Sequence, residues 1–218
     1  MIFKLDLHIH SIYSKDSSNT IDNIIKRIKK LGLDGFALTD HDTLNGISEA
    51  SQKKDDLLFI PALEVSAKNA HILAFDPIEL IPDNLGIIET VEIIHEQGAL
   101  AILAHPYGLP RSWVNSKIVE QADFDAIEVA NSAQFPYRYI LEKNLKLANK
   151  LSLPEIGGSD SHVPSTIGKA YTLIESSSRD IDDILDSIKK GRTKWYGSPI
   201  SFVQRIEKYF PKKEKMIA

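Results

Sequence analysis

The feature that most constrains this chain is the alternation of short apolar, β-rich segments with segments of helical periodicity. This pattern is typical of βα units, which build a mostly parallel sheet covered by helices. We expect strands at residues 3–8, 35–39, 58–63, 71–75, 100–104, 126–130, 155–158 and 170–174. The sequence therefore predicts an α/β fold.

The segments between the predicted strands carry helix signals. Thr20 is suited to cap a helix that Gly32 ends, and the apolar residues between them share one face. We expect further helices at residues 85–97, 136–151 and 181–190. No repeat or Gly/Ser linker divides the 218 residues, so we assign residues 1–203 to one domain. Residues 204–218 form a lysine-rich C-terminal tail that we expect to fray.

The composition excludes several classes of protein. There are no cysteines, so a bound metal must be held by nitrogen and oxygen atoms. The net charge of −4 argues against nucleic-acid binding through bulk charge but allows a local cationic site. No apolar run approaches about 18 residues, and the N-terminus turns polar too early for a signal peptide. We therefore expect a cytoplasmic protein without a membrane segment.

Histidines gather at the ends of the predicted strands. Six of the seven histidines follow or open a strand: His8, His10, His41, His71, His105 and His162. The carboxyl ends of barrel strands converge on one face, where active sites form, so we expect these side chains to meet. The placement of His71 depends on the direction of its strand. The remaining one, His95, lies near a helix C-terminus, where a cation is favourable, and we interpret it as structural.

Two of the strand-end motifs are compatible with metal binding and with plainer interpretations. His8 and His10 are two residues apart, so both imidazoles point to one side of an extended chain; two ordinary core or surface histidines are the alternative. In the Thr39–Thr43 run, His41 is a candidate ligand and Asp40 is suited to orient an imidazole. The alternative is a polar turn in which Asp42 or Thr43 caps the next helix.

Two carboxylates stand out in the same way. Glu64 lies in an apolar strand, where a carboxylate needs a partner, and its two oxygens suit it to bridge two ions; a salt bridge is the alternative. Asp160 and His162 follow Gly157 and Gly158, which permit a close approach of the backbone to a ligand. A plain turn would explain the glycines but not the histidine. Finally, Pro106 is expected to hold His105 in an extended conformation at the strand end.

These motifs, in this order, resemble those of the PHP (polymerase and histidinol phosphatase) phosphoesterases. The resemblance runs from about residue 5 to 165 and is strongest to the TrpH-like group, although the inserted subdomain of those relatives is missing between His71 and His105. It implies a distorted (β/α)7 TIM-like barrel with two to three divalent metal ions. The motifs that carry it are Asp6-Leu-His-Ile-His-Ser, Ser14-Lys-Asp, Thr39-Asp-His-Asp-Thr, Leu63-Glu-Val-Ser, Ala104-His-Pro and Gly158-Ser-Asp-Ser-His.

The resemblance also implies a distribution of ligands. One ion takes His8, His10, Glu64 and Asp160; a second takes Glu64, His71 and His105; a third takes Asp16, His41 and His162. Asp16 is alternatively an exposed turn residue. We expect catalytic roles for His41, His162, Glu64 and Asp160. Three divalent ions outweigh three carboxylate ligands by a charge of about +3, so the pocket of this acidic protein is cationic and suits a phosphate.

The predicted reaction is the hydrolysis of a phosphate ester by in-line attack of a metal-bridging hydroxide. Imidazole and carboxylate ligands suit Mn²⁺, Zn²⁺ or Fe²⁺. Arg111 and Lys15 are candidates to contact the substrate phosphate, with an exposed solubilising charge as the alternative for each. By resemblance alone we expect a nucleotide or short oligonucleotide substrate. No protein partner is evident.

Three alternatives stay open. The first is a histidinol-phosphate phosphatase of the same family. The second is an amidohydrolase-like enzyme, for which a bridging lysine would be expected at a strand end, and we find none. The third is a metal-binding module without turnover, which the nearly complete set of ligands argues against.

Overall fold

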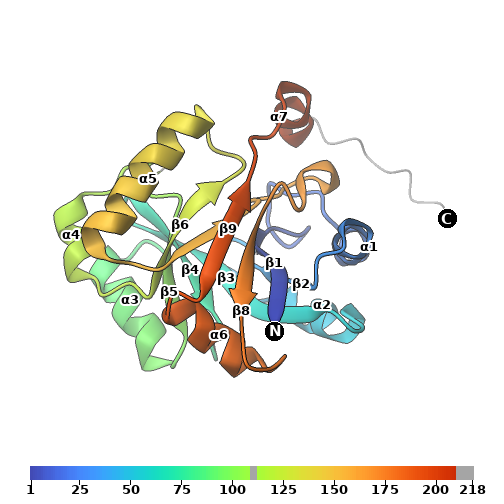
Figure 1. The fold of residues 1–218 in the computed structure, drawn as a ribbon, viewed down its shortest axis with the longest axis horizontal. Coiled ribbons are helices and arrows are strands. Elements are labelled where there is room, and N and C mark those ends of the chain that lie inside the picture. The colour runs from blue at the N-terminus through green and yellow to red at the C-terminus, as the bar shows by residue number, and fades with distance from the viewer. Residues whose placement is uncertain (109–111, 210–218) are drawn as a thin grey trace.

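The computed structural model describes residues 1–108 and 112–209 (Figure 1). In this part of the chain one sheet has the order β7-β6-β5-β4-β3-β2-β1-β8-β9. The strands are β1 (Ile2–Ile9), β2 (Gly35–Leu38), β3 (Leu58–Ala67), β4 (Ala70–Phe75), β5 (Leu100–Ala104), β6 (Ala126–Asn131), β7 (Glu155–Gly158), β8 (Ala170–Glu175) and β9 (Thr193–Gly197). The helices are α1 (Ile21–Leu31), α2 (Ile47–Lys53), α3 (Ile87–Glu96), α4 (Ser116–Gln121), α5 (Tyr137–Leu151), α6 (Ile181–Lys189) and α7 (Phe202–Tyr209).

Strands β1 to β7 curl into a nearly closed barrel. Just beyond β7, Ser161 forms a parallel bridge with Ile9, and its backbone exchanges hydrogen bonds with His8 and His10. On the outside of this seam, Thr172 of β8 bonds the backbone N–H and C=O of Gly157 in β7. Because the first and seventh strands meet in this way, the predicted distorted seven-stranded α/β barrel is confirmed.

Strand β4 runs against its neighbours. It pairs antiparallel with both β3 and β5, and its second residue, His71, lies opposite Ala104 at the carboxyl end of β5. The start of β4 is therefore at the same end of the barrel as the carboxyl ends of the parallel strands. This direction, which the sequence left undecided, brings His71 to the other strand-end histidines.

Apolar side chains fill the opposite end of the barrel. Phe3, Leu5 and Phe75 are buried there with residues of α6, which packs across this end. Two further apolar layers lie outside the sheet, one beneath α3, α4 and α5 and one beneath α1 and α2. The interior is thus apolar except where the strand-end motifs enter it.

The predicted helix ends are confirmed where local chemistry sets them. The Thr20 hydroxyl accepts a hydrogen bond from the backbone N–H of Asn23, and Gly32 ends α1 in the left-handed region at φ 65°. Strand β9 and the helices α4 and α7 were not predicted from the sequence, and α2 entered only as the helix of the alternative interpretation of the Thr39–Thr43 run. The predicted boundary at residue 203 lies inside α7, which begins with a Ser201–Gln204 capping box.

Residues 204–209, assigned from the sequence to a fraying tail, are helical and contact the domain. The Gln204 side chain donates to the Ser165 carbonyl, and the Arg205 guanidinium donates to the Ala133 carbonyl. These contacts hold the helix at the rim of the barrel. The remaining tail, 210–218, lies outside the described residues. None of the described helices is long and apolar enough to cross a membrane.

Candidate metal centre

The buried pair His8 and His10 forms the centre of a cluster at the carboxyl end of the barrel. Strand β1 presents both imidazoles to the interior, and their Nε2 atoms are 3.1 Å apart. The Nδ1 atom of His8 faces Glu128 Oε1 at 3.0 Å, and that of His10 faces Ser14 Oγ at 3.3 Å. The Ser14 hydroxyl donates to Asp40, so it accepts from His10. Both Nδ1 atoms therefore carry a hydrogen, and in the neutral rings the two Nε2 lone pairs face each other.

Two carboxylate oxygens complete this electron-rich group. Glu64 Oε2 lies 3.4 Å from Nε2 of His8 and 3.3 Å from that of His10, and Asp160 Oδ1 lies at 3.8 and 3.3 Å. Four lone-pair donors at such distances repel one another unless a cation lies between them. With metal–ligand bonds of about 2.1 Å, the ligand atoms of a tetrahedral site are about 3.4 Å apart. The observed spacing fits a divalent metal ion.

Glu64 joins this group to other histidines. Its Oε1 atom is 2.8 Å from Nδ1 of His71 and 2.9 Å from Nε2 of His105, and its Oε2 atom is 3.1 Å from Nδ1 of His41. In the described part of the chain no lysine or arginine pairs with Glu64, and its ionic partners are imidazoles. A carboxylate that faces imidazoles on both oxygens is placed to bridge two ions.

A third group lies nearer the solvent. Nε2 of His162 is 3.1 Å and Nε2 of His41 is 3.8 Å from Asp16 Oδ2, and the Asp16 side chain is 41% exposed. Nitrogen atoms of His10, His41 and His162 are also close enough together to share one ion. The structure thus brings together every ligand predicted from the sequence, with Asp16 at the mouth of the site.

Comparisons with known proteins agree with this geometry. Residues 141–193 match the family described as PHP-associated. An uncharacterized protein of Methanocaldococcus jannaschii is 35% identical over 59% of this chain and 82% of its own length. A probable phosphatase of Proteus mirabilis is 25% identical over 80% of this chain and 84% of its own. The chain belongs to the PHP family.

Solved structures share the PHP fold of this chain at low sequence identity. A two-domain protein of Bacteroides vulgatus, containing a predicted PHP-like metal-dependent phosphoesterase, superposes with a TM-score of 0.77 over 96% of this chain and 69% of its own, at 19% identity. A lesion-specific endonuclease of Pyrococcus furiosus does so with a TM-score of 0.71 over 89% of this chain and 58% of its own, at 23% identity. These similarities establish a shared barrel.

The protonation of the PHP cluster follows from its burial and its charges. Burial lowers the pKa of His10, but hydrogen bonds to Asp160 and Glu64 outweigh it and raise this pKa to about 9. Burial lowers the pKa of His41 to about 3. Burial would raise the pKa of Glu64, yet the surrounding imidazoles hold it well below its ordinary value. In the metal-free protein, a proton on His10 therefore supplies positive charge that compensates Glu64 and Asp160.

One backbone expectation, for His105, and one alternative interpretation, for Asp42 and Thr43, are wrong. His105 has a φ of 27°, not an extended conformation, because its N–H donates to Glu128 and its carbonyl accepts from Gly108, so the chain turns there. Asp42 and Thr43 do not cap α2, which follows Gly46; the Asp42 carboxylate instead accepts from the backbone and hydroxyl of Ser66. The turn at His105 swings its ring toward Glu64, and such strained positions cluster at functional sites.

Of the two predicted phosphate contacts, Lys15 and Arg111, the structure describes only Lys15. Lys15 is exposed beside Asp16 at the mouth of the site. Arg111 lies outside the described residues.

Asp40 supports His10 indirectly, since its carboxylate accepts from the Ser14 hydroxyl that faces the His10 ring. The expectation that Asp40 orients an imidazole is therefore met through Ser14.

The sequence analysis missed two polar residues of β6. Glu128 is fully buried against His8, and Asn131 donates to both Glu128 and Asp160. The signal was available, because Glu128 interrupts an apolar strand in the same way that Glu64 does. Strand β6 carries no histidine, and a histidine is what marks the ends of most of the other strands that contribute to the cluster.

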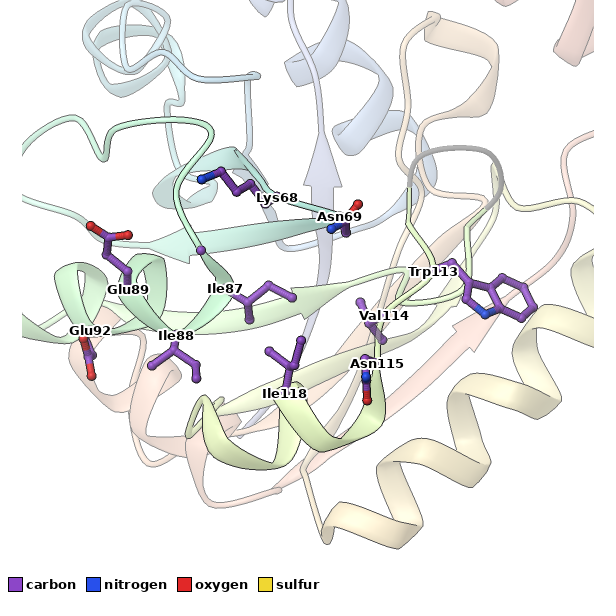
Figure 2. A pocket seen from close by; sticks show the side chains of 11 residues that line it. Lys68, Asn69, Ile87, Ile88, Glu89, Glu92, Trp113, Val114, Asn115 and Ile118 are labelled. Carbon is purple, nitrogen blue, oxygen red and sulfur yellow. The ribbon is translucent and has the colours of Figure 1, made fainter.

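A pocket of about 550 Å³ lies outside the β3–β4 hairpin, between the turn at Lys68 and Asn69 and the helices α3 and α4 (Figure 2). None of the predicted ligands lines it. Its wall is mostly apolar surface, to which Ile87, Ile88, Trp113, Val114 and Ile118 contribute, and Glu89 and Glu92 outnumber the one lysine. This pocket is therefore unsuited to a phosphate group, in contrast to the histidine cluster.

Proposed function

We propose that the protein is a metal-dependent phosphoesterase whose reaction takes place at the histidine cluster. The observation that carries this proposal is the meeting of four lone-pair donors, from His8, His10, Glu64 and Asp160, around one point. The phosphatase and phosphoesterase names of relatives support the same class of reaction.

The residues present fit two to three divalent ions. His8, His10, Glu64 and Asp160 would hold the first, Glu64, His71 and His105 the second, and Asp16, His41 and His162 the third. Nitrogen and oxygen ligands without sulfur suit Mn²⁺, Zn²⁺ or Fe²⁺. When bound, such ions supply a nucleophile at neutral pH by lowering the pKa of water, and they compensate the charge of the phosphate.

The side chains of the protein have separate tasks in this proposal. Glu64 and Asp160 would attract the positive ions to the interior of the barrel. The buried rings of His8 and His10 exclude bulk water from the interior side of the cluster. His162 and His41 lie toward the mouth beside Asp16, where a third ion that they would hold would supply positive charge near the leaving oxygen of an ester. Lys15 would meet a phosphate that approaches from solvent.

We further propose that the substrate is a nucleotide or short oligonucleotide. The Asp16 side chain is 41% exposed, so this side of the cluster would leave room for the leaving group of an extended ester in solvent. The barrel shared with an endonuclease supports this choice only at the level of the fold.

The test begins with the metal content of the purified protein, followed by turnover of aryl phosphate mono- and diesters with Mn²⁺. Nucleoside monophosphates, short single-stranded DNA and histidinol phosphate then identify the substrate class. We expect metal-dependent hydrolysis that falls at least about 10-fold in Asp16→Asn. Asp22→Asn is the matched control, because Asp22 is an exposed acid of helix α1 that pairs with Lys53 of helix α2.

Two outcomes would contradict the proposal. Bound metal without hydrolysis of any ester would indicate a binding module. Equal activity with and without a chelator would exclude the metal-dependent reaction. Preference for histidinol phosphate over every nucleotide would overturn the proposed substrate class alone.

A further inference from the structure

We infer that Glu128 is a positioning residue that holds His8 in the tautomer whose Nε2 lone pair faces the metal centre. The inference rests on the proposed function and concerns a strand, β6, that supplies no predicted ligand. Glu128 is fully buried inside the barrel. Its neighbours Ala126 and Ile127 belong to the inner and outer apolar layers, so the alternation of the strand points Glu128 inward.

Glu128 makes three hydrogen bonds to described residues. Oε1 faces Nδ1 of His8 at 3.0 Å, while Oε2 accepts from the backbone N–H of His105 at 3.1 Å and from Nδ2 of Asn131 at 3.0 Å. An ionised carboxylate accepts only, so Nδ1 of His8 must carry a hydrogen. The other ring nitrogen of a neutral His8 is then a bare lone pair, as a metal ligand requires.

Asn131 extends the same support to a second carboxylate. Its Nδ2 atom, which donates to Glu128, also donates to Asp160 Oδ2 at 3.3 Å, and its Oδ1 atom accepts from the backbone of Ala133. The remaining oxygen of Asp160, Oδ1, is the one that lies near His8 and His10. Strand β6 thereby steadies the side chain of His8 in β1, the backbone of His105 just after β5 and the side chain of Asp160 just after β7.

This arrangement predicts that glutamine cannot replace Glu128. In one orientation the glutamine NH₂ meets Nδ1–H of His8, which must then shift its hydrogen to Nε2 and lose its metal-facing lone pair. In the other orientation the NH₂ meets two donors, the His105 N–H and the Asn131 amide. Loss of such a partner typically weakens metal affinity about 10- to 100-fold.

The experiment compares the full chain with Glu128→Gln. Zn²⁺ affinity is measured by competition with a chelating dye, and ¹⁵N-histidine NMR of the Zn²⁺-loaded protein identifies the protonated nitrogen of His8. We expect Nδ1–H in the wild type and a 10- to 100-fold weaker Zn²⁺ affinity in the variant. Asp125→Asn is the matched control: Asp125 is a buried carboxylate that accepts from His95, Lys189 and the Ala101 backbone, at the start of β6.

The outcomes separate this inference from the proposed function. Affinities of Glu128→Gln and Asp125→Asn that both stay within about twofold of the wild type would overturn the role of Glu128. If Glu128→Gln does not fold, the wild-type spectrum decides, since zinc bound through Nδ1 of His8 would also overturn it. A wild-type protein that binds no Zn²⁺ would instead refute the metal centre itself.

Discussion

At the scale of single residues, the centre depends on competition between protons and metal ions for the same lone pairs. His8 and His10 are fully buried, and burial lowers their pKa values, but the carboxylates around them outweigh this and raise both. A metal-free protein therefore keeps protons at these positions near neutral pH. Each proton must leave when a metal ion binds.

This competition predicts a pH dependence of stability. The pKa of His10 rises from 6.5 to about 9 on folding, so between these values the unfolded chain binds fewer protons than the native protein. The free energy of unfolding of the chelator-treated protein should therefore decrease as the pH rises from about 6.5 to 9. Urea denaturation across this range measures it.

The metal-loaded protein is the control, because its His10 has no proton to lose and its stability should not show this decrease. A metal-free protein whose urea midpoint is constant from pH 6.5 to 9 would contradict the assignment of the proton to His10.

At the scale of elements, the side chains of His8 and Glu128 leave no space for a side chain at Gly158 of strand β7. A Cβ atom on Gly158 would lie 2.4 Å from the Cβ of His8 and 2.9 Å from Glu128 Oε1. Gly86, the residue before α3, has open space at the same position and no positive φ. A comparison of alanine variants at the two glycines therefore distinguishes the steric requirement at the centre from the general effect of replacing a glycine.

We expect Gly158→Ala to push His8 away from Glu128. Overpacking of this kind costs about 1–3 kcal/mol of stability, and the displaced His8 should reduce Zn²⁺ affinity at least about 10-fold. Gly86→Ala should leave the affinity unchanged. Thermal melts and dye competition on both variants test this, and equal affinities would show that His8 tolerates the displacement.

At the scale of the whole molecule, the proposed ions would join strands from opposite sides of the barrel. The candidate ligands come from β1, β3, β4 and the ends of β2, β5 and β7, so the native arrangement of nearly the whole sheet is needed to assemble them. Binding to the native state alone stabilises it by mass action.

Zn²⁺ or Mn²⁺ at about 100 times its dissociation constant should therefore add about 2.7 kcal/mol and raise the melting temperature by about 5–10 °C. Calorimetry with and without a chelator measures the shift. His10→Ala should show a smaller shift, and an identical shift in both proteins would place the stabilising ion elsewhere.

Local patterns predicted an α/β fold with a mostly parallel sheet and the histidines and acids at its strand ends, whereas the seven-stranded barrel and the role of Asp16 were implied by the resemblance to the PHP family. Apolar runs with a period of two mark strands, and polar residues at their carboxyl ends meet wherever such strands form a parallel barrel. The capping residues Thr20 and Gly32 set the bounds of α1 for the same local reason.

Only the tertiary structure decided how these residues are supported. The Glu128–His8 contact joins residues 120 positions apart, the turn at His105 depends on that same carboxylate, and the direction of β4 follows from pairing on both of its edges. Helix α7 likewise holds its place through contacts with Ser165 and Ala133. Such partners are chosen by packing between distant elements, and no local period in the chain records which of them will meet.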